Sequence, residues 1–141
     1  MKLHLTRRYS FAASHRLHNA QLGEKENERI YGKCNNPYGH GHNYVVEVAV
    51  SGPVDPATRM IANLSELDAF VEREVIEPLD HKYLNEEIPD FHERVPTSEN
   101  LCIEIFNRLR GFPRAKLERV RIEETGLNSF EYTGEPGGSI G

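Results

Sequence analysis

The sequence has few of the residues that define several large protein classes. Its 141 residues include two cysteines and no tryptophan, and charged residues interrupt its hydrophobic segments. Two cysteines do not suggest a disulfide framework, and no apolar run is long enough to predict a transmembrane helix or a signal peptide. We therefore expect a cytoplasmic protein with no membrane partner. In the cytoplasm, an isolated cysteine near histidines is more often catalytic or metal-binding than oxidised.

An excess of basic residues is also missing. The chain has 17 lysines and arginines against 22 aspartates and glutamates, a net charge of -5 and a pI of about 5.8. A nucleic-acid surface normally needs a basic stripe, so the composition argues against a nucleic-acid partner. It leaves room for a local basic pocket that binds a phosphorylated small molecule. The length fits a single domain with its own core.

Alternating and helical apolar patterns predict the order of the secondary structure. Residues 2–15 and 42–52 read as strands, and residues 18–39 between them read as a long polar loop. Two helices follow at 63–79, capped by Ser65 and ended by Pro78, and at 97–112, capped by Thr97 or Ser98. Residues 80–96 between them are predicted to be irregular, and a hairpin at 116–124 and 128–134 turns around Thr125 and Gly126.

This order predicts an α+β fold, with a four-stranded antiparallel sheet and both helices on one face. Such a sheet would leave two open edges, so we expect closure by oligomerisation. We predict one catalytic domain over residues 1–134 and a flexible tail over residues 135–141.

The histidine pair in "CNNPYGHGHN" has the spacing of a metal site on a strand. His40 and His42 are two residues apart, so on an extended chain both imidazoles leave the same face. A third histidine from a neighbouring strand would give three nitrogen donors and leave one position open on Zn²⁺, as in a catalytic site. His15 is the favoured third ligand because it ends an apolar strand, whereas His18 falls in the loop. The alternative is that both histidines lie on the protein surface and have no function.

Cys34 precedes His40 by six residues and lies in a polar loop beside Lys33. A thiolate is tolerated in such a setting, although a loop cysteine without a role fits it too. Cys102 lies on the apolar stripe of a predicted helix, which indicates core packing.

Two acidic positions are candidates for proton transfer or ligand binding. Asp80 and His81 would form a proton relay if they share hydrogen bonds, although neighbours on an extended segment point in opposite directions. Glu123 and Glu124 end an alternating strand, so one carboxylate points into a pocket or both lie at a solvated hairpin end.

Six segments of the chain, in order, resemble the 6-pyruvoyl-tetrahydropterin synthase family. The resemblance covers nearly the whole chain except the tail. The segments are "FAASHRL" (11–17), "KCNNPYGHGHNY" (33–44), "NLSELDAFV" (63–71), "PLDHKYLN" (78–85), "PTSEN" (96–100) and "RIEET" (121–125).

The resemblance implies the tunnelling fold, in which three subunits close a barrel around their sheets and two trimers stack as a hexamer. It implies that His15, His40 and His42 bind Zn²⁺. It further implies that Cys34 is the catalytic thiol, completed by Asp80 and His81 across a subunit interface. Glu124 matches the carboxylate that anchors the pterin ring. The remaining pocket residues implied by the resemblance are Thr97, Ser98 and Glu99.

The implied substrate is 7,8-dihydroneopterin triphosphate. Zinc would hold and acidify its side-chain hydroxyls, as it does bound water. Cys34 would remove a carbon-bound proton while Asp80 and His81 exchange protons, and elimination of triphosphate with tautomerisation would give 6-pyruvoyl-tetrahydropterin without a redox cofactor. Arg16 and Lys33 are candidate triphosphate contacts, or are simply solvated.

Three other functions compete with this interpretation. A 6-carboxy-5,6,7,8-tetrahydropterin synthase of queuosine (7-deazaguanine) biosynthesis uses the same substrate and metal, but the longer spacing from Cys34 to His40 favours the pyruvoyl product. A non-catalytic pterin- or zinc-binding protein would have lost the thiol or the relay, and both are present. A structural zinc site would need a fourth protein ligand with suitable spacing.

Overall fold

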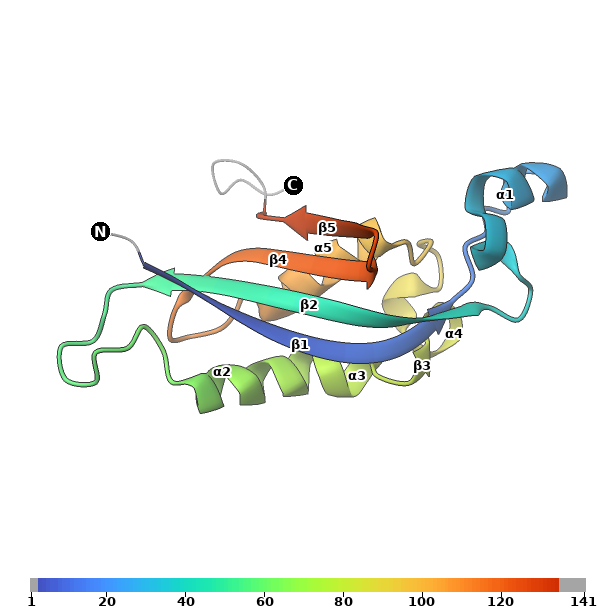
Figure 1. The fold of residues 1–141 in the computed structure, drawn as a ribbon. Helices are drawn as coiled ribbons and strands as arrows, with labels where there is room; N and C mark the ends of the chain where they lie inside the picture. The colour runs from blue at the N-terminus through green and yellow to red at the C-terminus, as the bar shows by residue number, and fades with distance from the viewer. Residues whose placement is uncertain (1–2, 135–141) are drawn as a thin grey trace.

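A computed structural model of the chain describes residues 3–134, and the tail predicted at 135–141 lies outside this range. The described residues form a five-stranded sheet with the strand order β3-β1-β2-β4-β5. Its strands are β1 (Leu3–His15), β2 (His40–Gly52), β3 (Lys82–Tyr83), β4 (Lys116–Thr125) and β5 (Asn128–Tyr132). The long strands run across the centre of the molecule in Figure 1.

The centre of the sheet is a long antiparallel pair. β1 and β2 stay in register from Leu3 opposite Gly52 to His15 opposite His40. Successive side chains of a strand point to opposite faces, so every second residue enters the core. The buried members of this face include Phe11 in β1 and Tyr44 in β2. The register therefore brings His15 of β1 to the same end of the same face as His40 and His42 of β2.

Four strands of the sheet follow the predicted antiparallel order, but the predicted strand count was wrong. β3 adds a fifth strand, which pairs parallel to β1 through Ala13 and Ser14. Residues 80–96 contain this strand and two short helices, α4 (Leu84–Glu87) and the 3₁₀ helix η3 (Pro89–Phe91), in place of the predicted irregular segment. A strand of two residues is too short to show an alternating pattern in the sequence. β3 forms because it pairs with β1 in the folded chain.

The two predicted helices lie on one face of the sheet, as expected (Figure 1). The first comprises α2 (Leu64–Val71), a π-helical turn η2 (Glu72–Ile76) and α3 (Glu77–Leu79), and the second is α5 (Ser98–Leu109). Their apolar side chains join those of β1, β2 and β4 in one buried cluster. Burial of this surface is the main driving force for the fold.

The first helix spans nearly the predicted residues 63–79, but its predicted cap and stop residues were wrong. Asn63, not Ser65, is the N-cap, because its side chain accepts hydrogen bonds from the backbone N–H groups of Ser65 and Glu66. Pro78 lies inside the last helical turn and does not end it. The π-helical turn precedes it, and Arg108 donates a hydrogen bond of 3.4 Å to the carbonyl of Glu74, the group that an N–H at position 78 would normally reach.

The segment predicted as a long loop at 18–39 contains α1 (Glu24–Tyr31) and the 3₁₀ helix η1 (Gly32–Asn35). Only Asn27 of α1 is buried, and its side chain bonds to the backbone of Asn19, Leu22 and Gly23. The helix therefore has no apolar stripe for a sequence pattern to detect. Figure 1 shows α1 projecting beyond the ends of β1 and β2.

The second helix and the hairpin agree with prediction. Thr97 caps α5 by accepting a hydrogen bond from the N–H of Asn100, and β4 and β5 turn at Gly126 and Leu127. Among residues 3–134, no helix has the length and apolar character that a bilayer crossing requires.

Candidate active site

The three histidines predicted to bind metal meet at one end of the sheet. His15 lies opposite His40 in the register, and His42 lies opposite Ala13. The ring of His42 lies 4.9 Å from that of His15 and 4.8 Å from that of His40, measured between centroids. The alternation that buries the core thus turns all three imidazoles to the same face.

His15 presents an unpaired nitrogen in the interior of the protein. Its side chain is fully buried, and Nδ1 lies 2.9 Å from the carbonyl oxygen of Pro96. A carbonyl only accepts, so Nδ1 carries the proton and Nε2 has a free lone pair. Within residues 3–134, Nε2 of His15 is the buried side-chain nitrogen or oxygen that lacks a hydrogen-bond partner. An orphaned buried nitrogen of this kind fits a metal ligand.

Burial keeps His15 in the form that metals bind. Desolvation, followed by the proximity of His42, lowers the pKa of His15 to about 4. Burial also lowers the pKa of His42. Both rings are therefore neutral at pH 7, with no proton to displace from a metal-binding lone pair.

Cys34 lies close to two of these histidines, His15 and His42. It lies in η1, where its carbonyl accepts a hydrogen bond of 2.7 Å from the N–H of Leu17. Its sulfur lies 3.8 Å from Nε2 of His42. The possible ligand atoms of His15, Cys34 and His42 all lie within 4.8 Å of one another. Nitrogen and thiolate donors at this separation suit zinc.

His40 is the predicted ligand that does not belong to this three-residue group in the described chain. Its ring contacts that of His42 but also borders a neighbouring cavity. The structure thus contains two overlapping donor sets. The predicted set has three imidazoles, and the observed group has two imidazoles and the thiol.

The turn before β2 depends on a glycine. Gly39 has a φ of 85°, and a Cβ at this position would lie 3.1 Å from the Tyr83 ring and 3.3 Å from the carbonyl oxygen of His15. Only glycine adopts such a conformation without strain. The "GHGH" run therefore bends close to the end of β1, which brings His40 and His42 beside His15.

The surroundings of Cys34 within one chain favour the protonated thiol. Burial, and then the charge of Glu124, raises the pKa of Cys34. The sequence-based argument that the loop and Lys33 support a thiolate is therefore not sufficient. A thiolate at this position needs a nearby positive charge, such as a metal ion or a protonated histidine.

Glu124 reaches the same site from β4. Its Oε2 atom accepts a hydrogen bond of 2.5 Å from the hydroxyl of Ser98 and lies 4.0 Å from Nε2 of His42. Ser98 is buried at the start of α5, next to the cap residue Thr97, whereas Glu99 is exposed. Three of the four predicted pterin-binding residues therefore gather where β4 meets the N-terminus of α5.

Asp80 and His81 lie together, as predicted for a relay. Asp80 Oδ2 is 3.4 Å from Nε2 of His81, and Oδ1 accepts a hydrogen bond of 2.9 Å from the N–H of Ala12. His81 has a φ of 60° and its N–H donates to the carbonyl of Ala12. This left-handed conformation is costly for a residue other than glycine and is typical of functional positions.

The relay does not meet the thiol within one chain. The side chain of His81 is 81% exposed, and among residues 3–134 no contact joins Asp80 or His81 to Cys34. His81 and His42 do border the same open cavity of about 470 Å³ beside β3. The relay therefore faces outward, at the edge of the sheet.

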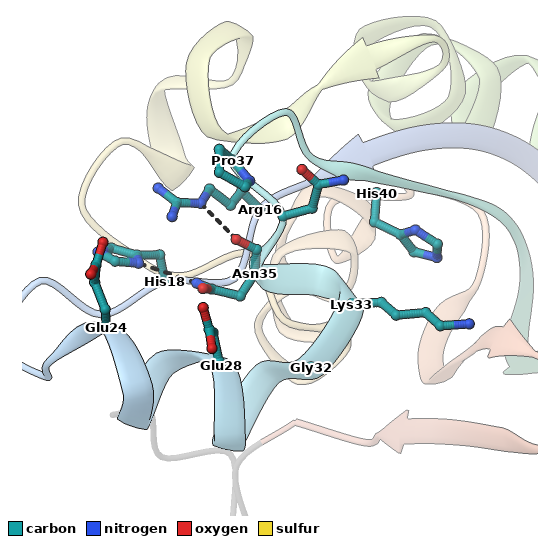
Figure 2. Close-up of a pocket in the computed structure, with 10 residues that line it drawn as sticks. Arg16, His18, Glu24, Glu28, Gly32, Lys33, Asn35, Pro37 and His40 are labelled. Atoms are coloured by element: carbon teal, nitrogen blue, oxygen red, sulfur yellow. Dashed lines mark hydrogen bonds between the residues drawn. The ribbon is translucent and has the colours of Figure 1, made fainter.

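A second cavity of about 430 Å³ separates α1 from the start of β2 (Figure 2). Arg16 and Lys33, the candidate triphosphate contacts, both line it, together with Glu24 and Glu28. Arg16 donates a hydrogen bond of 3.1 Å to the carbonyl of Asn35, and Figure 2 shows Lys33 extending away from Arg16. The negative charges of Glu24 and Glu28 would repel a bound triphosphate, so this cavity gives little support to a triphosphate site.

Sequence reasoning missed two groups that contact His15, the carbonyl of Pro96 and the side chain of Tyr44. The Tyr44 hydroxyl lies 3.3 Å from Nδ1 of His15, and the tyrosine is fully buried. Burial raises the pKa of Tyr44, and Glu124 and Cys34 add to the effect, so the phenol stays protonated. Its position two residues after His42, on the same strand face, was the signal that could have identified it.

The chain is similar to known proteins over nearly its whole length. The sequence profile described as 6-pyruvoyl tetrahydropterin synthase matches residues 4–135. A 6-pyruvoyl tetrahydrobiopterin synthase of Poecilia reticulata is 47% identical over 133 residues, which cover 94% of this chain and 90% of that protein. The structure of the Caenorhabditis elegans 6-pyruvoyl tetrahydropterin synthase superposes with a TM-score of 0.89 at 39% identity, covering 96% of this chain and 97% of that one.

A protein named for the alternative activity is also similar, over less of the chain. A putative 6-carboxy-5,6,7,8-tetrahydropterin synthase of Archaeoglobus fulgidus is 40% identical over 87 residues, which cover 60% of this chain and 67% of that protein. The pyruvoyl-type relatives therefore match a larger share of the sequence.

Proposed function

The chain belongs to the 6-pyruvoyl tetrahydropterin synthase family, and from this we propose that it is a zinc-dependent lyase that converts 7,8-dihydroneopterin triphosphate into 6-pyruvoyl-tetrahydropterin. The observation that carries the proposal is the meeting of the Cys34 thiol with His15 and His42 within 4.8 Å, beside Glu124. A thiol, a metal-type donor set and a carboxylate in one place match the needs of proton transfer on a bound pterin.

Glu124 binds and orients the pterin ring in this proposal. A carboxylate accepts paired hydrogen bonds from a ring N–H and the adjacent amino group, with the geometry of a fork. Ser98 holds Oε2 of Glu124 through its hydroxyl, so the carboxylate is oriented before substrate arrives. Thr97 fixes the helix start from which Ser98 projects, and the exposed Glu99 would contribute at the rim of the pocket.

His15, His40 and His42 would hold the zinc ion. When bound, zinc supplies Lewis-acid polarisation that acidifies the hydroxyls of the substrate side chain. The unpaired Nε2 of His15 supports this assignment. The fixed Nδ1–H of His15 keeps its ring in the orientation that a metal ligand needs.

Cys34 acts as the base. Its sulfur removes a carbon-bound proton of the substrate side chain, and Asp80 and His81 exchange protons with the site. Loss of that proton allows triphosphate to leave by elimination, without hydrolysis. Tautomerisation then moves two reducing equivalents from the side chain into the ring, so no redox cofactor is consumed.

The outward-facing relay supports an active site shared between subunits. Asp80 and His81 do not contact Cys34 in one chain, so we infer that they complete the site of a neighbouring copy. Within residues 3–134, β3 and β5 are the terminal strands of the sheet, and pairing between copies would cover the edges that remain open. A homohexamer of two stacked trimers meets both requirements.

A reducing compartment suits this chemistry. Neither Cys34 nor Cys102 is in a disulfide, and the proposed base must remain a thiol. The cytoplasm keeps thiols reduced, and we propose that the enzyme works there.

Zinc-dependent release of triphosphate tests the proposed function. The protein is stripped of metal, reloaded with zinc and incubated with 7,8-dihydroneopterin triphosphate, and inorganic triphosphate is followed by ³¹P NMR. We expect release by the parent protein only after zinc is restored, and none above background by Cys34→Ala. Release by Cys34→Ala at the parental rate, or by the metal-free protein, would overturn the proposal.

A further inference from the structure

The hydroxyl of Tyr44 is a buried polar group without a role in the chemistry described above. Tyr44 is fully buried in β2, and its ring stacks on Phe11 with centroids 5.2 Å apart. A phenylalanine at this position would pack against Phe11 equally well, so packing does not explain the hydroxyl. The hydroxyl oxygen lies 3.3 Å from Nδ1 of His15, and among the described residues it has no other hydrogen-bond partner.

The hydrogen-bond directions at His15 determine what this hydroxyl does. The Pro96 carbonyl, 2.9 Å from Nδ1, can only accept, so Nδ1 is a donor. The Tyr44 oxygen therefore faces an N–H and is its second acceptor. Two acceptors on one ring nitrogen favour the Nδ1–H tautomer and hold the ring plane in place.

The opposite nitrogen then faces the proposed metal position. With Nδ1 protonated, Nε2 carries the lone pair, and Nε2 is the buried atom left without a partner in residues 3–134. In metal sites, the second ring nitrogen of a ligating histidine is usually held by a carboxylate, carbonyl or water. Here a carbonyl from the segment before α5 and a phenol from the neighbouring strand β2 share this task.

We propose that Tyr44 is a positioning residue of the metal site, whose hydroxyl fixes the ring and tautomer of His15 so that Nε2 is presented to the metal. Tyr44 does not contact the metal itself. The inference rests on the proposed function only in that the site holds zinc, and it concerns metal affinity, not turnover.

Tyr44→Phe isolates the hydroxyl, because the phenyl ring keeps the stacking on Phe11. Tyr9→Phe is the matched control. Tyr9 lies on the same face of the sheet, and its hydroxyl donates a hydrogen bond of 2.7 Å to Asp68, away from the histidines. Both variants lose one phenolic hydroxyl, and only Tyr44→Phe alters His15.

Zinc affinity measured by competition with a chromogenic chelator is the first readout. We expect Tyr44→Phe to bind zinc about 10-fold more weakly or worse, the lower end of losses from outer hydrogen bonds at metal sites. Tyr9→Phe should match the parent. Thermal unfolding of the metal-free proteins should show no larger loss for Tyr44→Phe than for Tyr9→Phe. Equal zinc affinity in the parent and Tyr44→Phe would overturn the inference, whereas a parent that binds no zinc would overturn the proposed function.

The parent protein offers a second readout that does not depend on a folded variant. Nitrogen-15 NMR of the metal-free protein with labelled histidine should show His15 protonated at Nδ1 and unprotonated at Nε2. In Tyr44→Phe, the Nδ1 signal should shift, because one of its two acceptors is lost. A parent His15 protonated at Nε2 would contradict the inference directly.

Discussion

The sulfur of Cys34 lies 3.8 Å from Nε2 of His42, so the proposed base and a proposed metal ligand face the same small volume. Two assignments follow from this contact. In one, His15, His40 and His42 hold the metal and Cys34 remains free as the base. In the other, Cys34 replaces His40 as a ligand, which would block its role in proton transfer.

Single alanine substitutions separate these assignments. We expect His40→Ala to weaken zinc binding by more than the ~10–100-fold loss that follows removal of an outer hydrogen bond. Cys34→Ala should keep one zinc per chain and lose turnover. Metal content by atomic absorption after gel filtration is the measurement.

His18→Ala is the matched control for these variants. His18 lies outside the group formed by His15, Cys34 and His42 and bonds to the side chain of Asn35, so its loss should leave zinc content unchanged. Loss of zinc from Cys34→Ala, with zinc retained by His40→Ala, would reverse the assignment.

A shared active site predicts complementation between inactive variants. Cys34→Ala and His81→Ala should each be inactive alone, because each homo-oligomer lacks one part of every site. Co-expression in equal amounts should restore activity at about a quarter of the sites, since random assembly of a symmetric oligomer pairs an intact thiol with an intact relay that often.

The measurement is turnover of the purified mixture against each variant alone. Mixing the variants after assembly, without subunit exchange, is the control and should restore nothing. A co-expressed mixture as inactive as its components would place the relay and the thiol in the same subunit.

Glu124 should control substrate binding and catalytic efficiency. Glu124→Gln keeps the shape and removes the charge, so we expect kcat/KM to fall about 10–150-fold, the equivalent of roughly 1.5–3 kcal/mol for a hydrogen bond to a charged group. Steady-state kinetics give the value.

Substitutions at Ser98 test how much the orientation of the Glu124 carboxylate contributes to catalytic efficiency. Ser98→Ala should lower kcat/KM less than Glu124→Gln does, and Ser98→Thr should remain near the parent because it keeps the hydroxyl that bonds to Glu124. A Ser98→Thr variant as impaired as Ser98→Ala would show that the hydroxyl is not what matters.

The sequence predicted the parts of the fold that follow a simple period. β1, β2 and α5 carry clear alternation or an apolar stripe with a cap, and they form where expected. α1 was missed because its only buried residue is the polar Asn27, which stabilises it through hydrogen bonds to the backbone. β3 was missed because its pairing with β1 depends on tertiary structure.

The candidate site, like the fold, has parts that the sequence predicted and parts that it did not. The His-x-His spacing and the end of an apolar strand made His42 and His15 candidate ligands, and the family resemblance gave Cys34 its role. The fold brings all three together. The contact between His15 and Pro96 joins residues 81 positions apart, and no local pattern encodes it. The separation of Cys34 from the Asp80–His81 relay was implied only by the family resemblance, because sequence order does not show which chain a side chain faces.

An ion pair distant from the site predicts a pH effect on stability. Arg7 donates two hydrogen bonds to Asp68 and Tyr9 donates a third, and these bonds lower the pKa of Asp68. A depressed pKa means that the carboxylate stabilises the fold above the ordinary pKa of aspartate, and that this stability is lost as the pH falls through the folded-state pKa.

Asp68→Asn should therefore be less stable than the parent near pH 7, and the difference should shrink toward pH 3. The loss of stability should be modest because the side chains of Arg7 and Asp68 are both more than a third exposed to solvent. Urea unfolding at several pH values provides the measurement. A difference that stays constant across this range would mean that the charge of Asp68 does not contribute.

The identity of the product tests the central claim most directly. The zinc-loaded protein is incubated with 7,8-dihydroneopterin triphosphate under anaerobic conditions, and the pterin product is identified by mass spectrometry. The account predicts 6-pyruvoyl-tetrahydropterin with release of inorganic triphosphate and no acetaldehyde. Formation of 6-carboxy-5,6,7,8-tetrahydropterin with acetaldehyde would contradict it.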